Sequence, residues 1–561
     1  MESKMSSFTQ SYVHNPLPLR FAGDTISDNL DQSVEMFPDK EAFVFPAVGV
    51  RITFRNFKQQ VDIMASKFLQ LAVEIGDCVG IWAGTCLEWL ISFYAAAKVG
   101  ARVAQFQVGF TSQIMERLLN VTKCKILVNS KGDHPSVDLY EIISELESCE
   151  VGTPHVQTRF PSFQTVIEMD EDGKQGSLSF QQILTTGYVS EKELQARQHQ
   201  VCSDNILSLY FTSGSTGFPK CVVHTHHTQI NSQRASNTRE KCSKARELLA
   251  SSDLAHIGAI RAILFPGLFG TTSIFLPPKY SIENTMRMLQ DECITRTRLR
   301  PNVLFDVINH PHFNEYNLQS LETVFTGGYL VPESIMKLAE SALGCHVVDD
   351  YGSTEMIDGL FSEVYGVSSE EMLKYPNCMY PTPGNEIKVV DAGGNIVTVN
   401  TIGELWVRSP FLFLYYLDDK EATNKVKTSD GWFKSGDLVS MNEDGWCKIV
   451  GRLNDMIIRE GINIYPSEIE MAIALHPKVS QVQVVAIPDE KVHQRVCICI
   501  ITKNSQVCTE EEILKFCHGR IHAAHIPDHV IFVKEFPKTF SNKLDRRQLA
   551  KVAEEKLFSK K

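Results

Sequence analysis

The chain has 561 residues, which is too long for one ordinary hydrophobic core and predicts about three or four domain-sized units. Its hydrophobic content of 43% and charged content of 22% are ordinary for a globular protein. The net charge of −12 gives no electrostatic support for binding to DNA or to an anionic membrane, which argues against a nucleic-acid-binding function.

Strands alternate with helices in the first half of the chain. The apolar runs 78–82 and 125–128 are bounded by turn residues, as buried strands are, and residues 88–98 between them have helical spacing. This alternation predicts an α/β domain with parallel strands. The polar segment 162–188 is interpreted as a peripheral excursion, and residues 391–395 as a hairpin turn.

A domain boundary is expected directly after Arg452, because the elements beyond it form a compact α+β unit of domain size. These elements are predicted helices at 466–475 and 510–518 and predicted strands at 481–487 and 496–501. We therefore expect an N-terminal domain, residues 1–452, and a C-terminal domain, residues 453–561.

Targeting signals are weak. The first residues lack the apolar core of a signal peptide and include Glu2 with few arginines, so we expect neither a secretory signal nor a mitochondrial presequence. The apolar stretch 262–276 is too short to span a membrane and contains Pro266, so no transmembrane segment is expected. The ending Ser559-Lys560-Lys561 resembles a peroxisomal signal without its leucine. The expected location is cytoplasmic, with the peroxisome and the mitochondrion as alternatives.

The 15 scattered cysteines predict reduced thiols.

The most informative stretch follows an apolar run and combines four hydroxyl side chains, two glycines and a lysine. Its residues are Thr212, Ser213, Gly214, Ser215, Thr216, Gly217 and Lys220. Backbone N–H groups and hydroxyls can surround polyphosphate oxygens, and a lysine adds a point charge. The stretch is not a Walker A loop, because Lys220 follows Phe218-Pro219 and precedes Cys221. The residues by themselves leave two interpretations open, a nucleotide triphosphate site and a flexible loop.

Four further motifs occur in order along the chain. They are Asp-Tyr-Gly-Ser-Thr-Glu at 350–355, Gly-Trp-Phe-Lys-Ser-Gly-Asp at 431–437, the stretch 451–470 that begins Gly-Arg-Leu-Asn-Asp, and Pro-Lys-Thr-Phe-Ser-Asn-Lys at 537–543. Together with the loop, they resemble the adenylate-forming (ANL) superfamily, which contains acyl-CoA synthetases, beetle luciferases and peptide-synthetase adenylation domains. The resemblance extends from about Gly23 onward. Residues 448–452 and 460–466 in particular resemble acyl-CoA synthetase family member 2 and related invertebrate ligases.

This resemblance implies an α/β fold with a large multi-subdomain N-terminal adenylation domain and a small mobile α+β C-terminal lid. It also implies ATP, Mg²⁺ and CoA as cofactors and a small carboxylic acid as substrate. The implied reaction is formation of an acyl-adenylate with release of pyrophosphate, followed by transfer of the acyl group to CoA. The sequence gives no indication of oligomeric state.

The resemblance also implies roles for individual residues. Thr212 and the rest of the loop would hold the phosphates, and Thr354 would be a ligand of the α-phosphate. Glu355 would be a carboxylate associated with magnesium. Tyr351 would stack on adenine with Gly328 beside it, and the adjoining Asp350, Gly352 and Ser353 belong to the same nucleotide-binding stretch.

The second half of the chain would supply the ribose contacts and the catalytic lysine. Asp437 would accept hydrogen bonds from both ribose hydroxyls, and Arg452 would be a donor nearby. Lys543 would bridge the attacking carboxylate and the α-phosphate as the bond between them forms. The alternative is that Lys543 belongs to a solvated basic face. Gly461 would line the tunnel through which the CoA thiol arrives.

Three positions depart from the superfamily pattern: Cys221 and Asn542 replace glycines, and Asn454 replaces an aspartate or lysine at the hinge.

The acid pocket is expected around 256–258, 326–328 and 352–353. The run 255–269 is largely apolar, which favours a medium-chain fatty or aryl acid. Two alternatives stay open: a luciferase-like monooxygenase that shares the adenylation step, and a non-catalytic member of the fold.

Overall fold

The computed structural model describes residues 9–130, 139–142, 160–170, 177–212, 218–237, 245–249, 253–276, 281–328, 333–362, 375, 378–489, 491–503, 507–538 and 544–558. The chain divides into two compact units. The large unit comprises His14–Glu386 with Arg408–Gly431, and the small unit comprises Met1–Val13, Ile387–Val407 and Trp432–Lys561. Residues 432–452 thus belong to the same compact unit as the C-terminal residues. The predicted domain boundary after Arg452 stays a prediction.

The first sheet of the large unit has seven strands in the order β10-β9-β5-β4-β6-β7-β8. Its strands are β4 (Cys78–Trp82), β5 (Arg102–Phe106), β6 (Cys124–Asn129), β7 (Thr165–Glu168), β8 (Leu178–Ser179), β9 (Ile206–Thr212) and β10 (Lys220–Thr225). The strands β4 to β9 are parallel, and β10 is antiparallel to β9. The parallel strands confirm the predicted α/β arrangement. The helices of this part are α2 (Phe54–Gln70), α3 (Leu87–Lys98), α4 (Ser112–Thr122), α5 (Leu139–Ile142), α6 (Phe180–Thr186), α7 (Glu191–Gln198) and α8 (His226–Ser236).

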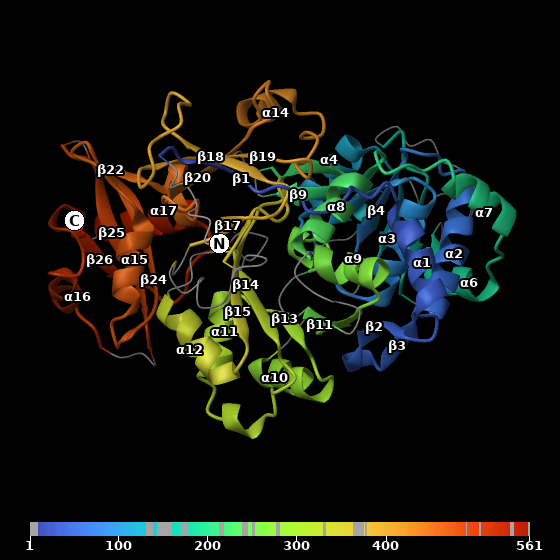
Figure 1. Cartoon of the computed structure of the whole chain (residues 1–561), viewed down its shortest axis with the longest axis horizontal. Helices are drawn as coiled ribbons and strands as arrows, with labels where there is room; N and C mark the ends of the chain where they lie inside the picture. Colours follow the sequence, from blue (N-terminus) through green and yellow to red (C-terminus); the bar gives the residue numbers. More distant parts are fainter. Residues whose placement is uncertain are drawn as a thin grey trace, which may run out of the picture. The chain divides into compact units, whose positions relative to one another are not determined.

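The second sheet has nine strands in the order β17-β16-β15-β14-β13-β11-β12-β2-β3 (Figure 1). Its strands are β2 (Glu41–Phe45), β3 (Val50–Thr53), β11 (Arg246–Leu249), β12 (Thr272–Phe275), β13 (Arg296–Arg298), β14 (Thr323–Gly327), β15 (His346–Tyr351), β16 (Leu360–Phe361) and β17 (Tyr380–Pro381). The accompanying helices are α1 (Ile26–Met36), α9 (Ile260–Phe269), α10 (Ile282–Asp291), α11 (Pro301–Ile308), α12 (Glu333–Leu343) and α14 (Lys420–Val426).

The two faces of this second sheet pack against different sets of helices. On one face Leu248, Val324 and Val347 pack into an apolar core with α10, α11 and α12. The side chains of alternate residues point to the other face. That second face includes Phe43 and Phe275, which lie in a large core together with α1, α2, α3 and α9.

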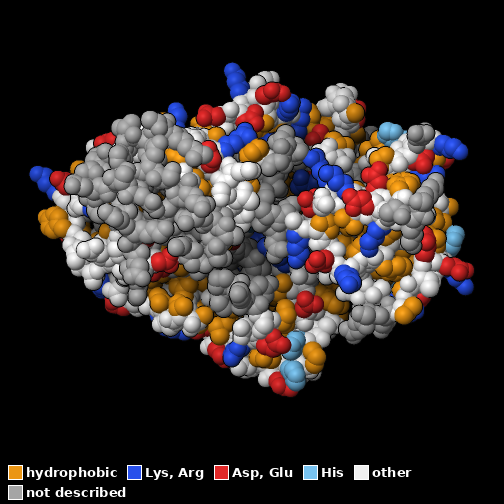
Figure 2. All heavy atoms as spheres, turned by 180° about the vertical axis from the view of Figure 1, so that it is seen from behind, with side chains coloured by type: hydrophobic (Ala, Val, Ile, Leu, Met, Phe, Trp, Pro, Cys, Tyr) orange, Lys and Arg blue, Asp and Glu red, His pale blue; other side chains and the backbone are white. Residues whose placement is uncertain are grey.

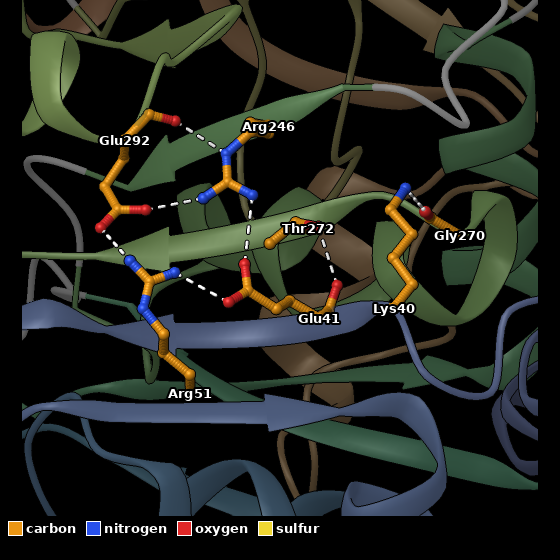
Figure 3. A network of polar contacts seen from close by, with 7 residues as sticks. All are labelled: Lys40, Glu41, Arg51, Arg246, Gly270, Thr272 and Glu292. Atoms are coloured by element: carbon orange, nitrogen blue, oxygen red, sulfur yellow. Dashed lines mark hydrogen bonds and ion pairs between the residues drawn. The ribbon is translucent and has the colours of Figure 1, made fainter.

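An ion network holds the β2–β3 hairpin at the edge of the nine-stranded sheet (Figure 3). Arg51 binds Glu41 at 2.8 Å and also binds Glu292. Arg246 lies 2.6 Å from Glu292 and 3.2 Å from Glu41. Burial raises the pKa of Glu41, but hydrogen bonds from the two arginines outweigh it and leave the pKa below its ordinary value. The network therefore joins β2, β3, β11 and the end of α10.

The small unit contains a five-stranded sheet and a C-terminal α+β body. The sheet is β1 (Tyr12–His14), β18 (Glu386–Val390), β19 (Ile402–Arg408), β20 (Phe433–Met441) and β21 (Cys447–Arg452). The body has β22 (Ile457–Arg459), β23 (Ile462–Ile464), β24 (Val479–Asp489), β25 (His493–Thr502) and β26 (His529–Phe532), with helices α15 (Pro466–Ala474), α16 (Glu510–Cys517) and α17 (Arg546–Phe558). The predicted elements at 466–475, 481–487, 496–501 and 510–518 are confirmed within a few residues at their ends.

Acidic and basic side chains are interspersed over the face drawn in Figure 2. Among the described residues, no helix is both long and apolar enough to cross a membrane. Every cysteine in the described ranges is a free thiol, as the scattered spacing predicted.

Candidate active site

The hairpin formed by β9 and β10 holds the ends of the Ser/Thr/Gly loop. The two strands are antiparallel, and Thr212 pairs directly with Lys220 across the hairpin. Residues 213–217 lie outside the described residues, so the structure gives no contacts for Ser213, Gly214, Ser215, Thr216 and Gly217. What it does give is the pairing of Thr212 with Lys220, the described residues at the two ends of this stretch that belong to the motif.

A segment far along the chain, residues 413–417, is hydrogen-bonded along β10. The N–H of Leu414 donates to the carbonyl of Val223 at 2.9 Å, and the N–H of Leu417 donates to that of Cys221 at 2.8 Å. The Lys427 ammonium donates to the carbonyl of Phe413 at 2.9 Å and fixes the start of the segment. This backbone pairing brings the side chain of Tyr416 to the loop hairpin.

Tyr416 contacts both Lys220 and Glu355. The Lys220 ammonium lies 4.7 Å from the centre of the Tyr416 ring, within cation–π range. The Tyr416 hydroxyl donates a hydrogen bond of 2.7 Å to Oε1 of Glu355. Burial and the neighbouring Glu355 carboxylate raise the pKa of Tyr416, so the phenol stays protonated and remains a donor. The structure thus assembles the lysine of the loop and the acid of the 350–355 motif around one tyrosine.

The 350–355 motif is a tight turn after β15. A side chain at Gly352 would place its Cβ 1.9 Å from the carbonyl oxygen of Ile357, so only glycine fits there. Ile357 itself has a φ of +60°, which is unusual for a β-branched residue and marks a strained turn. Asp350 ends the strand region in an ion pair, accepting a 2.7 Å hydrogen bond from Arg298. Burial raises the pKa of Asp350, and Arg298 opposes that rise.

Buried His224 supports the motif from β10. Its Nε2 lies 2.7 Å from the carbonyl oxygen of Thr354, and its Nδ1 lies 3.1 Å from Oγ1 of Thr228. Burial lowers the pKa of His224 to about 4, so the ring is neutral at physiological pH. A neutral imidazole that donates to Thr354 fixes the backbone beside Glu355.

In the small unit, Asp437 and Arg452 face each other across β20 and β21. Nε of Arg452 lies 2.9 Å from Oδ1 of Asp437. The Asp437 side chain is 6% exposed, whereas that of Arg452 is 62% exposed, so the ion pair joins a covered carboxylate to a solvent-facing guanidinium. The structure therefore brings together the two residues expected at the ribose.

Gly461 lies in the two-residue turn between β22 and β23. Its φ is +80° and that of Glu460 is +52°, so both turn residues are left-handed, as in the tight hairpins that favour glycine. No other atom would lie within 4 Å of a Cβ at Gly461. Lys543 and Asn542 lie outside the described residues, and Lys538 and Leu544, which flank residues 539–543, pair with each other.

Two supporting residues were missed in the sequence. Tyr416 lies outside every quoted motif, and His224 follows the loop within an ordinary strand. No periodic signal marks either residue, since their contacts join positions 61 and 130 residues apart.

The single carboxylate of Glu355, held on one oxygen by Tyr416, retains acceptor capacity on the other and is a hard oxygen ligand of the kind Mg²⁺ takes.

A second group of possible metal ligands does not have the form of a site. His476, Cys508 and Glu512 in the small unit lie within 4.8 Å of one another. However, Lys478 binds the Glu512 carboxylate at 2.9 Å, and its backbone N–H donates to Nδ1 of His476 at 3.3 Å. The histidine then carries its proton on Nε2, the nitrogen that faces the group.

Comparison with known proteins matches this architecture along most of the chain. Residues 30–417 match the AMP-binding enzyme family, and residues 468–543 match the AMP-binding enzyme C-terminal domain. The medium-chain acyl-CoA ligase ACSF2, mitochondrial, of Danio rerio is 31% identical over 98% of this chain and 92% of its own length. The human protein of the same name is 29% identical over 98% and 90%.

Solved structures agree on the fold. The anthranilate CoA ligase AuaEII, in complex with anthranoyl-AMP, has a TM-score of 0.82 at 23% identity and covers 96% of this chain and 99% of its own. A Mycobacterium tuberculosis fatty acyl CoA synthetase has a TM-score of 0.69 at 25% identity, with 94% and 99% covered.

The fold and the relatives define an adenylating enzyme of the acyl-CoA ligase type, an acid–thiol ligase. The chain belongs to the AMP-binding enzyme family, within the adenylate-forming superfamily. Acyl-CoA ligases of this family use a carboxylic acid, ATP, Mg²⁺ and CoA, which agrees with the cofactors expected from the motifs.

Proposed function

We propose that this protein activates a medium-chain fatty or aryl acid with ATP, forming an acyl-adenylate and pyrophosphate, and then transfers the acyl group to CoA. The observation that carries this proposal is the cluster of Lys220, Tyr416 and Glu355, which joins the loop and the second motif in the large unit. The ACSF2 relatives are named medium-chain acyl-CoA ligases, which supports a medium chain length.

The residue roles are part of the same proposal. Thr212, the loop residues and Lys220 would hold the phosphates, while Glu355 would bind Mg²⁺, which supplies charge neutralisation when present. Asp437 and Arg452 would exchange their mutual ion pair for contacts with the ribose. Lys543 would act on the reacting carboxylate and phosphate, and a lid beginning after Arg452 would rotate between the two half-reactions.

The test is a pyrophosphate-release screen with ATP and Mg²⁺ over a panel of acids, with and without CoA. The proposal expects acid-dependent pyrophosphate in both conditions and acyl-CoA only when CoA is added. Light emission on adding a luciferin, ATP and oxygen would favour the luciferase-like alternative. Absence of any acid-dependent product would favour a non-catalytic member of the fold.

The compartment is proposed to be the cytoplasm. The relatives named above carry a mitochondrial designation, so the mitochondrion is the main alternative. Fluorescence microscopy of protein labelled separately at each end, scored against mitochondrial and peroxisomal markers, would decide between the compartments.

A further inference from the structure

A strand inside the large unit carries arginine at every second position. In β13, Arg296 and Arg298 flank Thr297, so the two arginines lie on one face of the nine-stranded sheet. Thr297, on the opposite face, donates to the carbonyl of Leu248. Arg296 is 4% exposed and the Arg298 side chain 22% exposed, which places two cations on a largely covered surface.

Neighbouring elements add more charges to the same face. The strand register places Glu247 of β11 beside Arg296, and helix α9 contributes Arg261. Nε of Arg261 lies 3.3 Å from Oε1 of Glu247, and Arg298 pairs with Asp350. We call these five residues the charged row: Glu247, Arg261, Arg296, Arg298 and Asp350.

The charged row is costly as a purely structural device. Burying ionised groups carries a desolvation penalty that ion pairing rarely exceeds, and apolar side chains of similar volume usually serve as well. The guanidinium of Arg261 lies 4.2 Å from the ring centre of Phe265 and 4.5 Å from that of Phe325, so it is enclosed by aromatic carbon. A ligand that uses the row would account for the presence of these charges in an apolar setting.

Among the described residues, two buried polar atoms beside the row, Oε2 of Glu247 and Oγ of Ser273, have no hydrogen-bond partner, although buried polar groups are nearly always satisfied. Glu247 and Ser273 are paired in the register of β11 and β12 and so share one face. The carboxylate oxygen can only accept and so requires a hydrogen-bond donor, whereas the hydroxyl can accept or donate.

The row lies among the segments expected to hold the acid. Helix α9 begins two residues after the 256–258 segment, Phe325 directly precedes 326–328, and Asp350 precedes the 352–353 segment by two residues. The register aligns Glu247, Arg296 and Thr323 at one level of the sheet. Gly327 is four residues further along β14, about 13 Å away at the usual rise of a strand. This span suits a medium-chain acid.

The apolar run 255–269 therefore has another explanation than an apolar substrate. Ala262, Ile263 and Leu264 of α9 are buried in the large core together with α1, α2 and α3. Arg261 is the residue of the helix that is turned toward Glu247 and Phe325. Most of the apolarity of the run is thus used in packing, while Arg261 directs a charge toward the sheet.

We propose that the acid substrate carries a hydrogen-bond donor, a hydroxyl or amino group, at the end remote from its carboxylate, and that Glu247 and Ser273 receive this group while Arg261 holds Glu247 in place. The proposal rests on the acid-activating function proposed above and names its substrate class. Glu247, Ser273 and Arg261 are in this account specificity residues that take no part in the reaction itself.

The test compares acids of matched length in the pyrophosphate assay with the full chain. The panel is octanoate, its ω-hydroxy and ω-amino derivatives and octanedioate, with the corresponding decanoate set. We expect kcat/KM for an ω-hydroxy or ω-amino acid to exceed that of the plain acid by about 10- to 100-fold, because the plain acid leaves buried polar groups unpaired. The two derivatives distinguish a hydroxyl from an amine.

Two variants connect this preference to the row. Glu247→Met combined with Arg261→Met replaces the ion pair by apolar side chains, which generally preserves folding, and should bring the preference to unity or reverse it. Ser273→Ala should lower it about tenfold or less. The control pair, Arg246→Met with Glu292→Met, removes an ion pair from the β2–β3 network of the same sheet and should leave the preference unchanged.

Three results would overturn the proposal. One is a wild-type preference for the plain acids or for the dioic acids. Another is an unchanged preference in the Glu247→Met, Arg261→Met variant when its melting curve shows a folded protein. The third is the absence of acid-dependent pyrophosphate release with every compound. That result would contradict both the proposed function and this inference, whereas the first two results leave the proposed function standing.

Discussion

The hydroxyl of Tyr416 donates a 2.7 Å hydrogen bond to Oε1 of Glu355, while the ring of the same tyrosine lies under the Lys220 ammonium. One side chain thus holds the orientation of the acid from the second motif and the lysine from the first. The segment that carries Tyr416 is fixed by backbone hydrogen bonds to β10, so the orientation follows from the hairpin itself.

Tyr416→Phe keeps the ring and removes only the hydroxyl. Because a hydrogen bond to a carboxylate contributes about 1.5–3 kcal/mol, we expect pyrophosphate release to fall about 10- to 100-fold and to require more Mg²⁺ for half-maximal rate. Measurement of the rate across a magnesium titration checks this, with Tyr415→Phe as the neighbouring control. An unaltered magnesium requirement would show that Tyr416 only packs.

Acid should destabilise the large unit through two buried histidines. Burial lowers the pKa values of His224 and His226 to about 4 from 6.5. Between these pH values the unfolded chain binds protons that the folded chain does not, so stability is full above pH 6.5 and falls as pH drops toward 4. Each histidine accounts for up to about 3 kcal/mol at the acid limit.

The measurement is urea unfolding at a series of pH values. His224→Gln should flatten the decline between pH 6.5 and pH 4, because an amide can still donate to the Thr354 carbonyl but does not titrate. His14→Gln, at an exposed position, is the control. Equal pH profiles for wild type and His224→Gln would contradict the assignment.

Lys543→Ala should separate the two half-reactions. A charge that acts mainly in the transition state is expected to contribute two to four powers of ten to adenylation, roughly as oxyanion-type donors do. Thioester formation from preformed acyl-adenylate should be nearly unaffected. Lys538→Ala, at an exposed lysine in the same motif, should leave both steps unchanged. If Lys543→Ala slowed both steps equally, the lysine would have a structural role.

Gly461 can be tested without straining its turn. Its φ of +80° penalises most side chains, so a large substitution such as leucine would confuse turn strain with obstruction of CoA. Asparagine tolerates the left-handed conformation, and Gly461→Asn should slow thioester formation about tenfold or more while adenylation continues.

The matched control is Gly519→Asn, since Gly519 has a φ of +74° and, like Gly461, open space around it. It should leave both half-reactions intact. A Gly461→Asn protein that melts normally and uses CoA at the wild-type rate would contradict the tunnel assignment and weaken the ligase interpretation of the second step.

Local patterns predicted much of the fold. The buried strand Cys78–Trp82 has its predicted bounds, and α3 and α15 differ from theirs by one residue at one end. These elements can be predicted from apolar spacing and turn residues, which are properties of short stretches of sequence. The pairing of Asp437 with Arg452 agrees with the resemblance to the adenylate-forming superfamily, which implies that both residues lie at the ribose.

Long-range contacts were the part that the sequence did not reveal. Tyr416 reaches Glu355 only through the pairing of residues 413–417 with β10, and no window of sequence contains both. The apolar run 255–269 was interpreted as a substrate-facing stretch, but α9 directs most of that apolarity into the core and Arg261 toward the sheet. Which face of an apolar helix meets a ligand depends on packing that composition does not specify.

The most direct test of the central claim is the identity of the products from ATP. Protein incubated with ATP, Mg²⁺, CoA and the acid panel should release pyrophosphate and AMP in equal amounts, with acyl-CoA detected by mass spectrometry, and none of these without an acid. Release of inorganic phosphate and ADP in place of pyrophosphate and AMP would contradict the adenylation mechanism on which the account is built.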